Sequence, residues 1–306
     1  MKSILITGGS GSFGTAFVKR LLEGTEYGRI CVYSRGEHRQ AAMRQELSDD
    51  PRLRFLVGDV RDRWRLTRAM DAVDVVCHAA ALKRIEVGHY NPVEMVRTNI
   101  EGAINVTEAA RDARVSKVVV LSTDKAFQPI SPYGQSKALA ERICLAANSG
   151  GTTKFSVTRY GNVWGSAGSV VPIWTSIIRS GCRILPLTDP DCTRFYMSMR
   201  EALDLVLRTI DTMKGGETMI PELPAYRLGD LARAMGAKAF VMRNPHATIE
   251  QWVYQDSLVP FNDNSNEIVA KITGLPEWEK QHESMCEGRC SKDARRMSVD
   301  ELRAAL

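Results

Sequence analysis

A short apolar segment that runs directly into a glycine-rich loop and a helix restricts the fold of this chain more than any other feature. Residues 4–7 are Ile-Leu-Ile-Thr, residues 8–14 are Gly-Gly-Ser-Gly-Ser-Phe-Gly, and an amphipathic run follows over 15–22. Glycines at 8, 11 and 14 allow a tight turn, close approach of the backbone to a pyrophosphate and close packing of the helix on the strand. The helix start adds free N–H groups and a positive dipole end. A glycine-rich turn alone is weak support, but between a strand and a helix this spacing predicts a dinucleotide-binding site.

Apolar segments alternate with helix-period segments through the first half of the chain. The expected strands are 4–7, 29–34, 53–58, 74–79 and 117–122, and the expected helices are 15–22, 39–47, 64–69, 92–113 and 134–147. Nearly continuous Val/Ile/Leu strands between helices are typical of a parallel sheet that is covered on both faces. The handedness of the crossovers then predicts an α/β fold with a doubly wound parallel sheet.

Composition excludes several classes of protein. Hydrophobic residues make up 44% and charged residues 25% of the 306 residues, which is ordinary globular usage and excludes a disordered or fibrous chain. The 41 basic and 36 acidic residues give a net charge of +5, which suits an anionic small molecule at least as well as nucleic acid. We therefore expect no nucleic-acid partner.

The cysteines and the N-terminal residues indicate a cytoplasmic protein. The seven cysteines are odd in number, and Cys31, Cys77 and Cys144 lie in apolar stretches, as buried free thiols do. The first residues reach the glycine loop without a signal-peptide pattern. No run of about 18 apolar residues is present, so we expect no membrane span.

The end of the second expected strand bears on the choice of dinucleotide. An NAD enzyme usually has an acidic residue there, which binds the ribose 2′-hydroxyl. This chain has Tyr33-Ser34-Arg35 instead, with His38 and Arg39 one turn later. Guanidinium groups bind a 2′-phosphate that a carboxylate would repel, so the sequence favours NADP. The alternative is that Arg35 and Arg39 are solvated residues at a helix start.

Two further strand ends carry residues that suit a dinucleotide. Asp59 and Val60 follow the third strand, where a carboxylate would face the adenine. Three small residues, Ala79-Ala80-Ala81, follow the fourth strand and leave room for the cofactor backbone.

The densest chemistry follows the fifth strand. Tyr133 and Lys137 are four residues apart at a helix start, so both project from one face. An ammonium near a tyrosine hydroxyl stabilises the phenolate and makes a base for a substrate hydroxyl. Ser122 ends the preceding strand, at the sheet edge where ligands bind in open α/β folds. The alternative is that the Tyr-x-x-x-Lys spacing marks only an exposed helix face.

Over about residues 3–235 the sequence resembles the extended short-chain dehydrogenase/reductases. Within them it is most similar to the inverting UDP-N-acetylglucosamine 4,6-dehydratases of pseudaminic acid and capsule pathways. The segments that carry the resemblance are 7–14, 33–35, 58–62, 78–83, 122–126, 133–137, 159–163 and 193–195. The Thr-Asp-Lys triplet at 123–125 together with Tyr-x-x-x-Lys is specific to this branch, whereas the glycine loop is shared by the whole superfamily.

The resemblance implies two domains. Residues 1–165 with 193–218 would form an NADP-binding Rossmann domain, and residues 166–192 with 219–306 a smaller, C-terminal substrate-binding domain. It also implies a homo-oligomer, a dimer or a hexamer. Val93, Val96, Ile100 and Ile104 recur at helical spacing, but such a stripe is more often core against the sheet.

The resemblance also implies a reaction, the dehydration of a nucleotide sugar by an NADP-dependent hydro-lyase. Tyr133 would take the 4-hydroxyl proton while hydride leaves C4 for NADP. Lys125 would then abstract the acidified C5 proton, and Asp124 would protonate the departing 6-hydroxyl. Hydride would return to C6 and leave C5 inverted. Burial of Lys125 favours the neutral, basic amine that this step needs.

These roles give three sets of candidate site residues. The catalytic residues are Asp124, Lys125, Tyr133 and Lys137. The cofactor-binding residues are Gly8, Ser10, Gly11, Ser12, Phe13, Gly14, Ser34, Arg35, Arg39, Asp59, Val60, Ala79, Ala81, Lys83, Ser122, Tyr133, Lys137 and Asn162. The substrate-binding residues are Lys83, Asp124, Lys125, Tyr133, Asn162, Val163, Val170 and Arg194.

The second half departs from the family pattern. Residue 167 is alanine where the family usually has arginine, and residues 242–246 replace an Arg-Pro-Gly-Glu-Lys segment that grips the nucleotide. Arg243 is a candidate replacement for one anchor. A nucleotide-sugar 4-epimerase or ketoreductase and a non-catalytic NADP-binding homologue therefore stay open as alternatives. Asp124 and Lys125 count against the epimerase, which needs no acid for a 6-hydroxyl.

Three possible metal ligands, His282, Cys286 and Cys290, are spaced four residues apart. Three ligands on one helix with no fourth would make a poor structural zinc site. We expect a surface helix there and no metal.

Overall fold

The computed structural model describes residues 2–24, 26–243, 251–254, 257–260 and 267–306, with side chains described up to 241 and from 267. The chain divides into two compact units. Unit 1 comprises Met1–Tyr160 and Ser198–Pro221, and unit 2 comprises Gly161–Met197 and Glu222–Leu306. The boundaries expected from the sequence lie at 165/166, 192/193 and 218/219.

Unit 1 is built on a seven-stranded sheet with the order β10-β6-β5-β4-β1-β2-β3. Its strands are β1 (Lys2–Thr7), β2 (Tyr27–Ser34), β3 (Leu53–Val57), β4 (Val75–His78), β5 (Lys117–Thr123), β6 (Lys154–Tyr160) and β10 (Thr218–Met219). All neighbouring strands pair in parallel. The strand order reverses between β1 and β4, which is where ligands bind in doubly wound sheets. The predicted doubly wound parallel sheet is confirmed.

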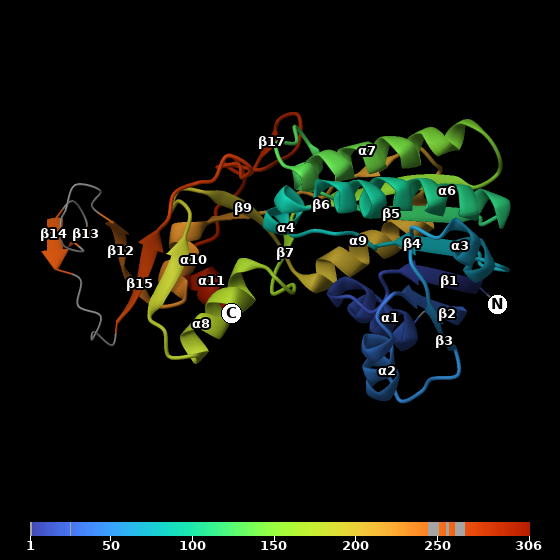
Figure 1. The fold of residues 1–306 in the computed structure, drawn as a ribbon, viewed down its shortest axis with the longest axis horizontal. Helices are drawn as coiled ribbons and strands as arrows, with labels where there is room; N and C mark the ends of the chain where they lie inside the picture. Colours follow the sequence, from blue (N-terminus) through green and yellow to red (C-terminus); the bar gives the residue numbers. More distant parts are fainter. Residues whose placement is uncertain (1, 25, 244–250, 255–256, 261–266) are drawn as a thin grey trace. The chain divides into compact units, whose positions relative to one another are not determined.

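Helices cover both faces of this sheet, as Figure 1 shows for α6 and α7 on one side and α1 and α2 on the other. The first layer contains α3 (Arg63–Ala69), α6 (Gly102–Asp112) and α7 (Pro132–Ala146), with α3 against α6 and α6 against α7. The second contains α1 (Ser12–Gly24), α2 (Glu37–Glu46) and α9 (Met199–Thr212), with α1 against α9. The expected helices at 15–22, 39–47, 64–69 and 134–147 are therefore confirmed.

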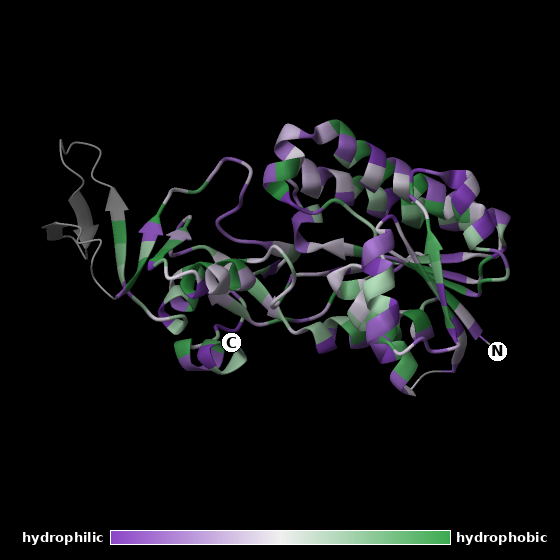
Figure 2. Ribbon diagram, turned by 60° about the horizontal axis from the view of Figure 1, so that its bottom comes forward, coloured by the Kyte–Doolittle hydropathy of each residue, from purple (hydrophilic) through white to green (hydrophobic). Residues whose placement is uncertain are grey.

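Burial explains why these segments fold as they do. Ile4, Leu5 and Ile6 of β1 are fully buried, as a strand covered on both faces requires. The helices carry both hydrophobic and hydrophilic residues (Figure 2), and they turn the apolar ones inward, such as Leu66 of α3 and Val106 of α6. Cys31, Cys77 and Cys144 are buried free thiols, as expected.

The long helix expected over 92–113 forms as three consecutive pieces. They are α5 (Pro92–Met95), the π-helical turn η1 (Val96–Glu101) and α6, after a short helix α4 (Ile85–Tyr90). Its apolar stripe does not pack on the sheet: Val93 is 59% exposed, Val96 44% and Ile104 37%. The expectation that this stripe is core is wrong, since α6 buries a different face, which includes Ala103, Val106 and Ala110.

Unit 2 has its own sheets and core. A three-stranded sheet has the order β11 (Ala225–Arg227), β9 (Thr193–Met197), β7 (Asn162–Val163). A five-stranded sheet has the order β14 (Ser257–Pro260), β13 (Gln251–Tyr254), β12 (Ala237–Arg243), β15 (Ile268–Ile272), β8 (Ile184–Leu187). The helices are α8 (Val170–Arg179), α10 (Leu228–Ala234) and α11 (Val299–Ala305). Trp174, Leu185, Leu231 and Leu302 lie in one apolar cluster.

Residues 284–290 are not helical, which corrects the expected surface helix. They form an antiparallel hairpin of β16 (Ser284–Cys286) and β17 (Arg289–Cys290), with Gly288 at a φ of 73° in the turn. Glycine adopts this left-handed conformation at no steric cost, so it favours the turn over a continuing helix. Across the described part of the chain, no helix combines the length and the apolar character that a membrane crossing requires.

Candidate active site

The glycine loop between β1 and α1 is held against the end of β4. Gly8 has a φ of +67°, and a Cβ atom there would lie 2.9 Å from the backbone of Ala80. A Cβ atom on Gly14 would lie 2.5 Å from Gly9. The Gly11 amide donates to the Gly8 carbonyl at 2.9 Å and closes the turn. Glycine is therefore required where the loop approaches Ala80 and where the helix packs on the loop, the two places that a pyrophosphate cradle needs.

A chain of polar contacts fixes the end of β2 to this loop. Ser10 Oγ donates to Ser34 Oγ at 2.8 Å. The buried amide of Gln40 donates to the same Ser34 Oγ at 2.9 Å and to the Leu56 carbonyl at 3.1 Å. Gln40 was not expected from the sequence, because an amide on a helix carries no signal until its partners are known.

Arg35 and Arg39 are exposed beside the end of β2, and Arg35 Nη1 lies 3.9 Å from Asp59 Oδ2. Asp59 accepts from the side chain of Arg61 at 2.7 and 2.9 Å and from its backbone amide at 3.0 Å. Burial disfavours the Asp59 carboxylate, but the hydrogen bonds from Arg61 outweigh it and lower its pKa. Asp59 is thus a fixed anion between two guanidiniums. The sequence offered a signal for this contact, because Arg61 follows Asp59 by only two residues.

The end of β4 contains a buried neutral pair. Thr7 Oγ1 lies 2.7 Å from His78 Nδ1 and accepts from the Ala80 amide at 3.2 Å. Burial, with the charge of Lys137, lowers the pKa of His78 to about 3. Further along, burial and the charge of Arg84 lower the pKa of Lys83. Thr7, whose carbonyl and hydroxyl accept from the Ala79 and Ala80 amides, holds the small-residue segment at 79–81 to the end of β1.

Asn99, in the π-helical turn η1, links this segment to α7. Its Oδ1 accepts from the Leu82 amide at 2.8 Å, and its Nδ2 donates to the Leu82 carbonyl and to Ser136 Oγ, both at 2.9 Å. Ser136 lies one residue before Lys137. Single π-helical turns frequently occur at functional sites. The sequence did not reveal Asn99, because its partners lie 17 and 37 residues away.

The acid–base residues lie where β5 ends and the short turn η2 (Asp124–Ala126) begins. Thr123 Oγ1 donates to Asp124 Oδ1 at 2.9 Å, and Lys125 Nζ lies 3.1 Å from the same oxygen. Asp124 is fully buried, and Lys125 is mostly buried. An ammonium and a carboxylate out of water at this distance form a tightly coupled pair. Thr123 belongs to neither the predicted catalytic set nor the predicted binding sets, but its hydroxyl contacts both Asp124 and the Lys125 amide.

Tyr133 faces this pair. Burial raises the pKa of Tyr133, the charge of Lys125 and a hydrogen bond with Thr123 lower it, and the charge of Asp124 raises it; together these effects give a pKa of about 12. The cation that most favours the Tyr133 phenolate is therefore Lys125. The effect of Lys137 on the Tyr133 phenolate stays a prediction.

Lys137 points its ammonium at the backbone instead. Lys137 Nζ donates to the Leu121 carbonyl of β5 at 2.6 Å, and the residue is almost completely buried. Burial lowers the pKa of Lys137 to about 8, while Glu141 one turn further along α7 opposes the shift. Lys137 thus joins α7 to the strand that carries Ser122.

The hydroxyl of Ser122 is buried and has no hydrogen-bond partner among the described residues. A buried hydroxyl usually finds a partner, so an unsatisfied one at a strand end suits contact with a bound ligand. Together with the cradle around Gly8 and Gly14, it shows that unit 1 fits a nicotinamide dinucleotide. Phe13 packs on Phe17 in the first turns of α1, with ring centroids 5.4 Å apart.

The remaining candidates lie in unit 2. Asn162 and Val163 form β7, Val170 begins α8, and Arg194 lies on β9. Asn162, Val163 and Val170 are partly exposed, whereas Arg194 is buried. Arg243 ends β12, and its side chain lies outside the described residues.

Arg194 is engaged within unit 2. Its Nη1 donates to the Thr193 carbonyl at 2.8 Å and to the Gln281 carbonyl at 3.1 Å, and its Nη2 pairs with Glu279. Burial opposes its charge, but Glu283 and Glu279 outweigh burial and raise its pKa. To bind a phosphate through Nη2, Arg194 would first have to give up its ion pair with Glu279. In this structure it holds β9 to residues 279–281.

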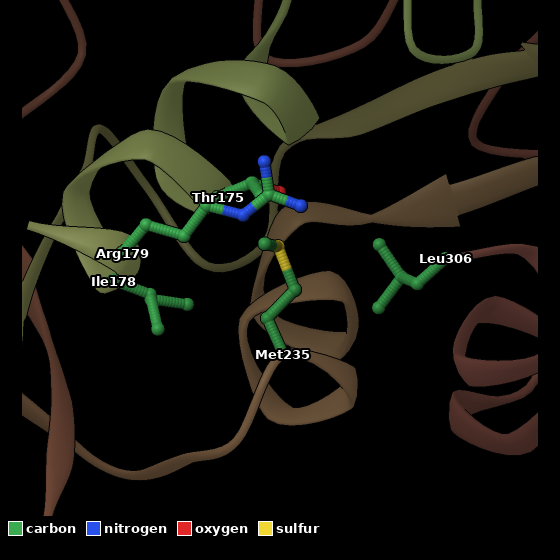
Figure 3. A pocket seen from close by; sticks show the side chains of 5 residues that line it. All are labelled: Thr175, Ile178, Arg179, Met235 and Leu306. Carbon is green, nitrogen blue, oxygen red and sulfur yellow. The ribbon is translucent and has the colours of Figure 1, made fainter.

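Two other places in unit 2 carry no catalytic arrangement. A hollow of about 230 Å³ is lined by Thr175, Ile178, Arg179, Met235 and Leu306 (Figure 3), and none of these is a candidate residue. His282 Nδ1 lies 2.9 Å from Thr193 Oγ1. In the described ranges, no three His, Cys, Asp or Glu side chains are grouped as a metal ion would require.

A family of polysaccharide biosynthesis proteins matches residues 4–301. A UDP-N-acetylglucosamine 4,6-dehydratase (inverting) from Campylobacter jejuni is 45% identical over 237 residues, 76% of this chain and 71% of the relative. A UDP-glucose 4-epimerase from Rickettsia conorii is 42% identical over 240 residues, 76% of this chain and 70% of the relative.

Solved structures show the same fold. Pen from Bacillus thuringiensis superposes with a TM-score of 0.84 at 29% identity and covers 99% of this chain and 97% of its own. DesIV, a dTDP-glucose 4,6-dehydratase from Streptomyces venezuelae with NAD and TYD bound, has a TM-score of 0.68 at 26% identity and covers 73% of this chain and 76% of its own.

Proposed function

Since this chain belongs to the polysaccharide biosynthesis protein family of extended short-chain dehydrogenase/reductases, we propose that it is an NADP-dependent nucleotide-sugar 4,6-dehydratase that inverts C5. The observation that carries the proposal is the buried pair of Asp124 and Lys125 beside Tyr133. The proposed acid, base and proton acceptor for the sugar hydroxyl are thus neighbours at the end of β5 and the start of α7. UDP-N-acetylglucosamine is the proposed substrate, because the inverting Campylobacter jejuni relative is named for it.

The coupled pair can prepare itself for elimination by moving one proton. As an ion pair, Lys125 holds the proton and Asp124 is a carboxylate, 3.1 Å apart. Transfer of that proton to Asp124 leaves a neutral amine and a neutral carboxylic acid, the forms that a general base and a general acid need. Burial of both groups favours the neutral forms over the charged ones.

Each residue then has one task. The glycine loop and Ser122 would hold a nicotinamide dinucleotide, whose chemistry would be to take up hydride from the sugar and to return it. Tyr133 takes the proton of the 4-hydroxyl, Lys125 removes the C5 proton, and Asp124 protonates the departing 6-hydroxyl. Ser122 and Lys137 would hold the cofactor.

The preference for NADP over NAD is supported by the charges at the end of β2. The segment Tyr33-Ser34-Arg35 contains no carboxylate, and the exposed guanidiniums of Arg35 and Arg39 lack the close hydrogen bonds that hold Arg61 to Asp59. Both Arg35 and Arg39 can reach solvent, where they would meet a 2′-phosphate. The glycine loop, Ser34, Asp59, Val60, the segment at 79–81, Lys83 and Asn162 complete the proposed cofactor contacts.

The exposed apolar stripe supports a homo-oligomer. Val93, Val96 and Ile104 remain at the surface along α5, η1 and α6, and Leu139 of α7 is exposed as well. Contiguous exposed apolar side chains on helices commonly mark protein interfaces. We propose that a second copy of the chain covers them, and that the oligomer acts in the cytoplasm without nucleic-acid or membrane partners. Unit 2 is the proposed substrate-binding part, with Asn162, Val163, Val170 and Arg194.

A panel of nucleotide sugars tests the function, with the mass of the product as the readout. Loss of one water from UDP-N-acetylglucosamine is expected. A product of unchanged mass with inverted C4 would support a 4-epimerase, the activity for which the Rickettsia conorii relative is named. No turnover with bound cofactor would support a non-catalytic homologue.

A further inference from the structure

A buried ion pair lies one turn beyond Lys137 and takes no part in the reaction steps above. Glu141 on α7 accepts from Arg159 on β6 through both carboxylate oxygens, with Nε to Oε1 at 2.9 Å. Both side chains are largely buried. A buried pair of this kind contributes little to stability relative to apolar residues of similar size, because its desolvation offsets the attraction. Its presence beside an active-site lysine therefore suggests a purpose other than stability.

The placement of Glu141 relates it to the catalytic helix face. Tyr133, Lys137 and Glu141 are spaced four residues apart on α7 and share one face. The Lys137 ammonium donates to the Leu121 carbonyl, and among the described residues it meets no carboxylate directly. Glu141 is the nearest anion along its own helix.

The other groups that face Lys137 are neutral. His78 of β4 stays unprotonated, since its pKa is lowered to about 3, and the buried Cys144 thiol of α7 has its pKa raised to about 12. Tyr133 carries its proton in the free enzyme, and the charge of Asp124 is balanced by Lys125. Glu141 is therefore the anion that acts on the Lys137 ammonium at neutral pH.

We propose that Glu141 is a positioning residue, whose buried negative charge keeps Lys137 in the ammonium form, and that the Arg159 cation, which pairs with Glu141, limits this effect. Arg159 also lies over the Phe127 ring, with its guanidinium carbon 5.9 Å from the ring centre, directly after the turn that carries Asp124 and Lys125. The pair thus joins α7 to the acid–base turn. Its importance for turnover rests on the proposed function.

The two partners should act on Lys137 with opposite signs. Glu141→Gln removes the anion and leaves two buried cations, so Lys137 should lose its proton at lower pH, by about one pH unit. Arg159→Gln removes a competing cation and leaves Glu141 in place, so the midpoint of Lys137 should rise. If the pair had only a structural role, either substitution would loosen the contact between Lys137 and the Leu121 carbonyl. The titration midpoint of Lys137 would then shift in the same direction in both variants.

The test is a titration of lysine labelled with ¹³C at Cε, in the full-length protein without cofactor or substrate. The Lys137 signal is assigned by its absence in Lys137→Arg. Glu217→Gln is the matched control, because Glu217 accepts from Ser156 and two backbone amides but does not act on Lys137. Glu141→Asp, which keeps the charge, should restore most of the wild-type midpoint.

A fall in Glu141→Gln together with a rise in Arg159→Gln supports the proposal, whereas unchanged midpoints or shifts in one direction overturn it. If Glu141→Gln does not fold, Arg159→Gln decides alone: a rise supports the proposal, and no change or a fall refutes it. In active enzyme, the alkaline limb of kcat should follow the same shifts. Because the titration needs no substrate, a wrong substrate assignment would abolish the kinetic readout but not the titration.

Discussion

Replacing Arg35 by aspartate should weaken the binding of NADP at least tenfold and leave the binding of NAD almost unchanged. Arg35 is 56% exposed and lies 3.9 Å from Asp59 Oδ2, so its guanidinium is available to a 2′-phosphate. A hydrogen bond to a charged group contributes about 1.5–3 kcal/mol, and solvent exposure places Arg35 at the low end. About 1.4 kcal/mol corresponds to tenfold in Kd, and repulsion between the new carboxylate and the phosphate adds to it.

The assay is a titration of both dinucleotides by calorimetry at one fixed ionic strength. Arg44→Asp serves as the control, because Arg44 is 54% exposed on α2 and its replacement changes the net charge equally. Asp59 keeps its bonds from Arg61 in either variant, so the adenine side should be preserved. Equal losses of affinity for NADP and NAD in Arg35→Asp would refute the reasoning, as would a similar loss of NADP affinity in Arg44→Asp.

Two further outcomes are expected. His78 is neutral in the folded protein down to about pH 3 but takes up a proton near pH 6.5 when unfolded, so the unfolded state binds more protons between these values and folding stability falls as pH is lowered. The loss is about 1.4 kcal/mol per pH unit, and His78→Asn should flatten this dependence in thermal unfolding between pH 4 and 7; an unchanged slope would contradict the assignment. Val96→Asp should convert the oligomer to smaller species in sedimentation, because it places a charge in the exposed stripe, and a wild-type protein that sediments as a monomer at micromolar concentration would remove the oligomer from the account.

The sheet could be predicted because its signals are local. Each central strand is a continuous apolar run, and the glycine loop must lie between a strand and a helix. Gly8 and Gly14 also had a steric reason that the structure bears out, since a Cβ atom at either would meet backbone atoms.

The supporting residues could not be predicted because their partners are distant in sequence. Gln40 and Asn99 are ordinary polar residues on helices until the fold brings Leu56 and Ser136 to them. The partner of Lys137 was missed for a related reason. Helical spacing places Lys137 on the face of Tyr133, but it cannot show that the ammonium reaches the Leu121 carbonyl instead.

Residue spacing alone did not predict which helix face is buried or whether residues 282–290 form a helix, because both depend on the surrounding structure. The stripe of Val93, Val96 and Ile104 has helical spacing, yet α6 turns its smaller residues to the core. At 282–290 the spacing of His and Cys suggested a helix face, but Gly288 favours a turn, and pairing between Ser284 and Cys290 makes a hairpin.

A single turnover of Lys125→Met with the nucleotide sugar tests whether Lys125 is the base for C5. Removal of a general base typically costs about two to four powers of ten in rate. Because Lys125 also favours the Tyr133 phenolate, the quantity to measure is the ratio of reduced nicotinamide, from its absorbance, to dehydrated sugar, from its mass. We predict that reduced nicotinamide accumulates without loss of water from the sugar, whereas Tyr133→Phe gives neither. Dehydration by Lys125→Met at close to the wild-type rate would contradict the account and place the base on another residue.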